Sequence, residues 1–142
     1  MFSIFQRKNI QRVSFEDVLF AIKHPEQFII MNTLSVNEQT CLIPNTVDCH
    51  TDEKIFNDLL NSYKLQSKNI IIYGRNNNDE TIETKYHQII GLGFKNVFLY
   101  HGGLFEWLLL QDIYGKAEFP TTTYILDILK FKPHRYFAGR LT

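Results

Sequence analysis

The chain has 142 residues, of which 44% are hydrophobic and 21% are charged, and its formal net charge at pH 7 is zero. That length predicts one domain with a buried core, and the zero net charge excludes whole-molecule attraction to nucleic acid or to an anionic membrane. The charge is uneven, because the residues from Lys116 onward carry five Lys and Arg against two acids, whereas residues 1–115 carry ten against thirteen. A nucleic-acid partner is therefore not expected, although the C-terminal end is mildly basic.

The cysteines and the apolar runs bear on the environment of the protein. Cys41 and Cys49 are the only two cysteines, too few for a disulfide framework, which favours the cytoplasm or another reducing intracellular compartment. No apolar run approaches the length of a membrane span, and the N-terminus lacks the apolar region of a signal peptide. We therefore expect no membrane association.

The first predicted elements are a helix and a buried strand. After a short extended segment at Arg12-Val13, Ser14 is placed as the N-cap of a helix, with Asp17 at the capping-box position. Apolar residues at helical spacing give this helix one buried face, and they are Phe15, Val18, Leu19 and Ile22. The helix ends at His24-Pro25, since the residue before proline is disfavoured in the α region, and Phe28–Met31 predicts a buried strand.

The middle of the chain predicts a turn, a short strand, a helix and another buried strand. The turn and the short strand occupy residues 42–50. Thr51–Glu53 begins the helix, whose apolar positions are Ile55, Phe56, Leu59, Leu60 and Tyr63. The run Asn69–Tyr73 contains three consecutive isoleucines and predicts the next buried strand.

The last elements are a helix, a strand and a further helix. The first of these helices carries Ile82, Tyr86, Ile89 and Ile90 and ends at Gly91 or Gly93. Val97–Tyr100 predicts a strand, and Gly102-Gly103 leads into a helix with core positions at Leu104, Phe105, Trp107, Leu108, Leu109 and Leu110. Strands that alternate with helices, each strand apolar throughout, predict an α/β fold with a mostly parallel central sheet and helices on both faces.

Four segments are expected at one edge of this sheet. In parallel sheets, ligands bind beyond the carboxyl ends of the strands. The segments that follow these ends are Asn32–Leu34, Cys49-His50, Gly74-Arg75 with its loop, and His101–Gly103. The sequence therefore places any site at this edge.

Several motifs resemble those of a known family. Ile43-Pro44 with Val47 is similar to a His-Ile-Pro-Gly-Ala turn, and Gly93–Val97, followed by Gly102-Gly103 and Trp107, is similar to a final strand and helix of the same family. These motifs are those of single-domain rhodaneses, whose sulfurtransferase fold is shared with dual-specificity cell-cycle phosphatases. The resemblance covers roughly residues 13–113 and implies a rhodanese-like fold.

The resemblance also implies a missing nucleophile. The family carries its catalytic cysteine directly after the central strand, in a Tyr-Cys-Arg sequence, and this chain has Tyr73-Gly74-Arg75. The family's Asp-Val-Arg pattern is here Asn32–Leu34, and the histidine before Ile-Pro is Leu42. No Ser, Thr or Cys in residues 75–80 could replace the thiol. We expect a catalytically inactive rhodanese-like domain with a protein-binding, scaffolding or structural role.

The loop after Gly74 supplies the candidate binding residues. They are Arg75, Asn76, Asn77, Asn78, Asp79 and Glu80, joined by His101 from the same edge. Asp79 and Glu80 stand where the next helix begins, so their carboxylates would satisfy the free N–H groups that an anionic substrate needs. Two alternatives stay open: Asn78 or Asp79 caps the helix while Arg75 braces the loop, or the loop still binds a small ligand or a partner's side chain.

Cys49 offers an alternative of a different class. It is followed by His50, which could act as its base, so that a relocated thiol would make the protein a thiosulfate-type sulfurtransferase or a phosphatase-like enzyme. A small buried hydrophobe is the simpler interpretation of a free cysteine. The remaining histidines show no metal-ligand spacing, and we expect no metal site and no cofactor.

The C-terminal segment exceeds the length of a minimal rhodanese. We divide the chain into a rhodanese-like domain at residues 1–115 and a C-terminal extension at residues 116–142. The extension either folds back over the sheet and completes the core, or acts as an interaction arm. The basic residues expected to face a partner from such an arm are Lys130, Lys132, Arg135 and Arg140. A protein partner is therefore expected at residues 74–80 or at this extension.

Overall fold

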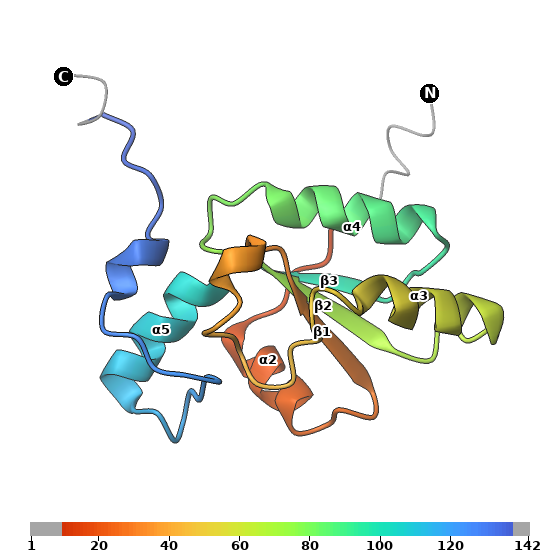
Figure 1. Cartoon of the computed structure of the whole chain (residues 1–142), viewed down its shortest axis with the longest axis horizontal. Coiled ribbons are helices and arrows are strands. Elements are labelled where there is room, and N and C mark those ends of the chain that lie inside the picture. Colours follow the sequence, from red (N-terminus) through yellow and green to blue (C-terminus); the bar gives the residue numbers. More distant parts are fainter. Residues whose placement is uncertain (1–9, 138–142) are drawn as a thin grey trace.

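The structure, a computed structural model, describes residues 10–137 (Figure 1). Its helices and strands follow one another in the order α2 (Phe15–Ile22), β1 (Phe28–Asn32), η1 (Val36–Glu38), α3 (Asp52–Asn61), β2 (Asn69–Tyr73), α4 (Thr81–Gly91), β3 (Val97–Tyr100), α5 (Gly103–Tyr114) and η2 (Ile128–Phe131). The elements η1 and η2 are 3₁₀ helices. The predicted capping box at the start of α2 is confirmed, because Ser14 N donates to Asp17 Oδ2 at 2.9 Å and Asp17 N donates to Ser14 Oγ at 3.4 Å.

The described part of the chain forms a parallel sheet of three strands in the order β1-β2-β3. β2 is central, and its Ile71 pairs with Ile30 on one side and with Phe98 on the other. Beyond the three strands, single bridges join Arg12 to Leu99 and Thr46 to Ile30. The predicted α/β architecture with a mostly parallel sheet is confirmed.

The predicted short strand within residues 42–50 is wrong. Only Thr46 pairs with the sheet there. Turns on both sides prevent a longer run, because Thr46 N donates to Ile43 O at 3.2 Å and Thr51 N donates to Asp48 O at 2.9 Å. Cys49 therefore lies in a turn before α3 and does not end a strand.

Helices cover both faces of the sheet (Figure 1). Successive side chains of a strand point to opposite faces, so Ile71 and Tyr73 join one apolar cluster while Ile70 and Ile72 join the other. The first cluster includes residues of α2 and α5, such as Val18, Ala21, Leu104 and Trp107. The second includes residues of α3 and α4, such as Phe56, Ile82 and Ile89. Leu109, predicted as core, is exposed on the outer face of α5.

The C-terminal segment lies against α5 as far as the structure describes it, and Figure 1 draws it in blue beside that helix. Phe119 and Phe131 are buried in the same apolar cluster as Trp107. The Trp107 Nε1–H donates to Pro120 O at 2.8 Å, and Thr122 N donates to Leu42 O at 2.9 Å. Of the basic residues of the predicted arm, Arg140 lies outside the described residues. The boundary between residues 115 and 116 stays a prediction.

None of the helices in residues 10–137 has the length and apolarity that crossing a membrane requires.

Candidate functional site: the loop after β2

Tyr73, the last residue of β2, anchors the carboxyl edge of the sheet. Its hydroxyl accepts a hydrogen bond from Ile43 N at 3.2 Å and lies 2.8 Å from Thr46 Oγ1. The side chain is fully buried, and burial raises the pKa of Tyr73 well above its ordinary value because the phenolate would be desolvated. The phenol therefore stays neutral and holds the residue 43–46 turn against the strand that leads to Gly74.

The Asp79 carboxylate fills the space beside Gly74. Its Oδ2 accepts from Arg75 N at 2.9 Å, while its Oδ1 accepts from Thr81 N at 3.0 Å and from Thr81 Oγ1 at 2.5 Å. A Cβ atom added at Gly74 would lie 3.0 Å from Asp79 Cγ and from Ile82 Cγ2, and closer still to Asp79 Oδ2. A side chain at position 74 thus requires Asp79 to move.

Other N–H groups of the loop also have partners within the chain. Asn78 N donates to Asn76 Oδ1 at 2.9 Å, and Asp79 N donates to Asn76 O at 3.3 Å. Together with the bonds to the Asp79 carboxylate, this occupies the N–H groups of residues 75, 78, 79 and 81. An external anion would have to displace a carboxylate that already carries negative charge.

The start of α5 packs closely on the same loop. Leu104 N donates to Gly74 O at 2.9 Å, and Phe105 N donates to Arg75 O at 2.8 Å. Gly103 has a φ of 68°, and a Cβ atom there would lie 2.8 Å from Asn76 N. Glycine is required at this position because both the backbone conformation and the close approach exclude a side chain.

Arg75 and Asn76 point toward the C-terminal segment. The Arg75 guanidinium forms an ion pair with Glu38 and donates through Nη2 to Lys130 O at 2.5 Å. Its central carbon lies 5.0 Å from the centroid of the Phe131 ring, within cation–π range. Asn76 is 7% exposed, and its Nδ2 donates to Phe131 O at 2.9 Å. Both side chains thus brace the loop against η2.

The pKa of Glu38 is shifted by its contact with Arg75. Burial by itself would raise the pKa of Glu38, but hydrogen bonds from Arg75 and Ser35, with the charges of Arg75 and Lys130, outweigh burial and lower the pKa below its usual value. Glu38 is therefore ionised at neutral pH and pairs with Arg75.

The remaining predicted residues share one hollow. Asn77, Asn78, Asp79, Glu80 and His101 line a hollow of about 490 Å³, together with Glu83 and Thr84. The Nε2 atom of His101 is buried and has no hydrogen-bond partner among the described residues. Burial and the charge of Arg12 lower the pKa of His101, while Glu83 opposes the shift. His101 is therefore neutral at pH 7, and the hollow is lined mainly by amide and carboxylate groups.

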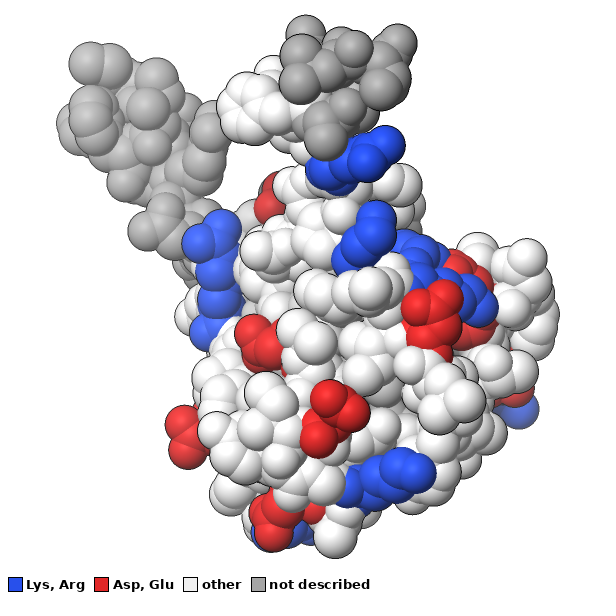
Figure 2. Space-filling view, turned by 90° about the vertical axis from the view of Figure 1, so that its left-hand side faces the viewer, with Lys and Arg blue, Asp and Glu red and all other residues white. Residues whose placement is uncertain are grey.

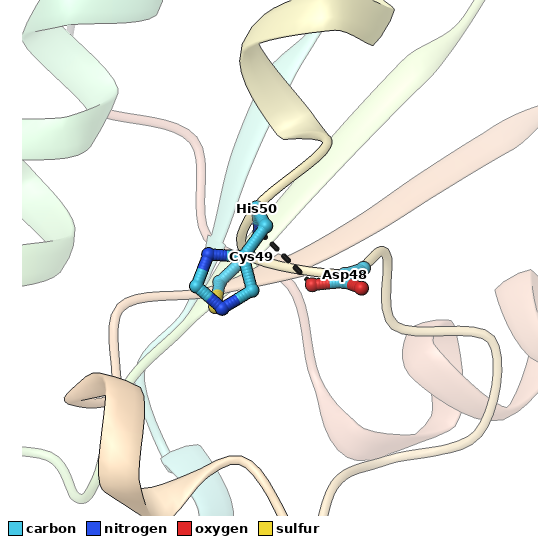
Figure 3. A group of neighbouring side chains, drawn as sticks. All are labelled: Asp48, Cys49 and His50. Carbon is cyan, nitrogen blue, oxygen red and sulfur yellow. Dashed lines mark hydrogen bonds between the residues drawn. The ribbon is translucent and has the colours of Figure 1, made fainter.

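Cys49 lies at a separate place, in the turn before α3 (Figure 3). It is half-buried and free, and one ligand atom of each of Asp48, Cys49 and His50 lies within 4.8 Å of the others. Cys41 is buried, and its thiol donates to Thr123 O at 3.3 Å.

Some residues of these sites were missed at the level of sequence. Glu38 is 37 residues from Arg75, and Phe131 is 55 residues from Asn76, so no local pattern points to either contact. Asp48 could have been predicted from the sequence as part of the Cys49 site, because it directly precedes Cys49-His50.

Fold and loop together define a class of protein. A parallel sheet between two layers of helices, with a strand–loop–helix at the carboxyl edge, is an α/β domain of the kind that places ligands at that edge. The rhodanese-like domain family matches residues 11–110, and the chain belongs to this family. No curated protein sequence matches the chain.

Solved structures share the fold. The BH2092 protein of Bacillus halodurans superposes with a TM-score of 0.58 and 19% identity, covering 80% of each chain. Ygr203w, a yeast protein tyrosine phosphatase of the rhodanese family, has a TM-score of 0.58 and 13% identity over 83% of this chain and 95% of its own. The Alr3790 protein of Anabaena sp. has a TM-score of 0.57 and 19% identity over 83% and 97%.

Proposed function

We propose that this rhodanese-like domain is catalytically inactive and acts by binding another protein. The observation that carries the proposal is the Asp79 carboxylate, which takes up loop N–H groups and the space beside Gly74. Sulfur transfer and phosphate-ester cleavage on this fold would need a thiolate there, with N–H groups free to hold an anion. This loop offers a glycine and a negative charge in their place.

An exposed apolar surface supports the binding role. We call it the α5–tail face, and its exposed members are Leu109, Ile113, Tyr114, Tyr124, Leu126 and Leu129. A hollow of about 390 Å³ is lined by Tyr124, Ile125, Leu126 and Ile128, together with residues near the end of α5. Figure 2 views this side of the molecule, where uncharged residues predominate between scattered Lys, Arg, Asp and Glu side chains. Large apolar side chains that are exposed on neighbouring segments are typical of protein interfaces.

The catalytic half of the proposal is tested by sulfur transfer from thiosulfate to cyanide. We expect no activity in the natural chain, in Cys49→Ser, or in Gly74→Cys, since the Asp79 carboxylate that the new side chain displaces still belongs to the same loop and opposes an anionic substrate there. The double variant Gly74→Cys/Asp79→Ala tests whether removing the Asp79 carboxylate restores sulfur transfer from thiosulfate to cyanide. Turnover by the natural chain would refute the proposal.

The binding half is tested by site-specific photo-crosslinking in cells. A crosslinking amino acid is placed at Leu126, on the α5–tail face, and in a matched control at Tyr63, which is 94% exposed after the end of α3. We expect a discrete crosslinked protein from position 126 that is absent from position 63. The same products from both positions would indicate collisions without a specific partner.

A second candidate function is an enzyme with Cys49 as the nucleophile. The observation in its favour is the proximity of His50 and Asp48 to Cys49, since a base and a group that orients it activate a thiol. Such a thiol reacts with iodoacetamide well below the ordinary thiol pKa of about 8.5. Labelling of Cys49 that becomes appreciable only near that pH would exclude this candidate, as would thiosulfate:cyanide turnover that persists in Cys49→Ser.

A further inference from the structure

The turn that precedes α3 gathers three side chains of metal-ligand type. One ligand atom of each of Asp48, Cys49 and His50 lies within 4.8 Å of the others. Figure 3 shows the His50 ring beside the Cys49 sulfur, with the Asp48 carboxylate to one side. Neither the family match nor the solved structures assign any role to these residues.

The backbone explains why three consecutive residues can converge. In an extended strand, successive side chains point to opposite faces. Here the chain turns, because His50 N donates to Asp48 Oδ1 at 2.9 Å and Thr51 N donates to Asp48 O at 2.9 Å. The Thr51 hydroxyl donates to the same carbonyl at 3.1 Å and reinforces the turn.

The site is also accessible. Asp48 and His50 are exposed and Cys49 is half-buried, so a cation reaches all three without unfolding of the domain. Zinc–ligand bonds of about 2.0–2.3 Å bring ligand atoms closer together than 4.8 Å. Rotation of the exposed Asp48 and His50 side chains would bring their ligand atoms to these shorter distances from one another and from the Cys49 sulfur.

We propose that Asp48, Cys49 and His50 bind a zinc-type divalent cation. Thiolate, imidazole and carboxylate form the ligand set that zinc takes, whereas calcium and magnesium prefer oxygen ligands alone. Three protein ligands leave a fourth position of a tetrahedral site for water or an external ligand. This proposal departs from the sequence-based expectation of no metal, which rested on the spacing of the two cysteines and of the other histidines.

The bound cation has two consequences for this chain. It fixes the turn that leads into α3, so binding stabilises the folded protein by mass action. The cation also coordinates the Cys49 sulfur, so alkylation of Cys49 is slower in the metal-bound protein than in the metal-free protein. The proposal does not depend on the proposed function, since a zinc site at this turn is compatible with an inactive loop after β2.

The test uses the full, reduced, metal-free chain. Cobalt(II) is titrated as a spectroscopic probe, and zinc is then titrated by calorimetry. We expect one ion per chain and a thiolate-to-cobalt charge-transfer band that zinc abolishes. Cys49→Ser removes this band, and Cys49→Ser and His50→Ala each weaken zinc binding about tenfold or more, since even changes behind the ligands cost roughly 10–100-fold.

Matched controls are available in the same chain. Cys41→Ser keeps a donor for Thr123 O, and His87→Ala alters an exposed histidine on α4. Both controls are expected to bind zinc as the natural chain does, and circular dichroism checks the folding of every variant. Absence of the thiolate-to-cobalt band in the natural chain overturns the proposal. Unchanged zinc affinity in His50→Ala, or an equal loss in the two controls, does so as well.

Discussion

Gly74 and Asp79 form a coupled pair at the start of the loop. The carboxylate of Asp79 holds Arg75 N and Thr81 N, and it can do so because Gly74 has no Cβ. The position of the Asp79 carboxylate therefore depends on glycine at position 74, because a cysteine side chain there would overlap with it.

The first prediction concerns this pair. Gly74→Cys should lower the free energy of unfolding by about 1–3 kcal/mol, because the new side chain displaces Asp79 and overpacks against Ile82. Urea unfolding of Gly74→Cys, Asp79→Ala and the double variant completes a double-mutant cycle. The effects should be non-additive by more than about 0.5 kcal/mol, as for residues in contact. Simple additivity would contradict the contact.

The second prediction concerns Tyr73 and pH. Tyr73→Phe should destabilise the protein by about 1–3 kcal/mol at neutral pH, because the buried Ile43 N loses its acceptor. The pKa of Tyr73 is raised in the folded state, whereas the unfolded tyrosine titrates near about 10. The stability that neutral Tyr73 contributes is therefore complete below about pH 10 and is lost as pH rises above it.

Urea unfolding between neutral and strongly alkaline pH checks this second prediction. The free energy of unfolding should fall less steeply above about pH 10 in Tyr73→Phe than in the natural chain. Some decline should remain, because burial and then its hydrogen bond to Glu106 also raise the pKa of Tyr100. Equal slopes in the two proteins would mean that Tyr73 titrates in the folded state as it does in the unfolded state.

At the scale of elements, η2 and the loop after β2 stabilise each other. The Phe131 side chain is 2% exposed and packs in the core. Its backbone carbonyl accepts a hydrogen bond from Asn76, and its ring lies next to the Arg75 guanidinium. Glu38 adds a contact from η1. Three segments that are distant in sequence thus meet at one loop, and this explains why Arg75 and Asn76 do not line the hollow beside His101.

The third prediction concerns η2. Phe131→Ala should lower the free energy of unfolding by about 3–5 kcal/mol, since it leaves a cavity in the core. The matched control Leu126→Ala alters a fully exposed side chain in the same segment and should change stability by less than about 0.5 kcal/mol. Urea unfolding followed by Trp107 fluorescence measures both. Similar small effects in the two variants would mean that η2 does not belong to the cooperative unit.

At the scale of the whole molecule, both faces of the sheet are covered by helices, and the C-terminal segment adds side chains to the apolar cluster on one face. The cluster beneath α2 and α5 contains both Phe119 and Phe131. The C-terminal segment therefore adds core to the domain through its buried side and offers the α5–tail face through its exposed side. The buried side agrees with the first alternative that the sequence left open, and binding of a partner through the exposed side stays our proposal.

The fourth prediction is that a chain ending at residue 117 loses most of its stability. Two buried phenylalanines contribute about 3 kcal/mol or more each, against a total of about 5–15 kcal/mol for a typical domain. Circular dichroism and limited proteolysis should report a chain that is largely unfolded at 37 °C. A soluble truncated domain with unchanged cooperative unfolding would instead assign the segment to an independent arm.

The sequence by itself determined the elements and the fold class. Local signals carried this information: the capping box at Ser14, the isoleucine run of β2 and the helical spacing in α4 each depend on neighbours within a few residues. It failed at residues 42–50, where turns at Ile43 and Asp48 leave one residue of pairing with the sheet. The first of these turns was predicted, but strand-like composition did not reveal the second turn, at Asp48.

Only the tertiary structure decided which loop residues face the hollow and which face η2. The sequence identified the loop at residues 74–80 as a unit, but Arg75 turns away because Glu38 and Lys130 reach it from segments far along the chain. The same holds for the α5–tail face, whose apolar members come from a helix and from the segment folded back beside it. Contacts across long separations depend on how the layers pack, and packing is a property of the folded chain as a whole.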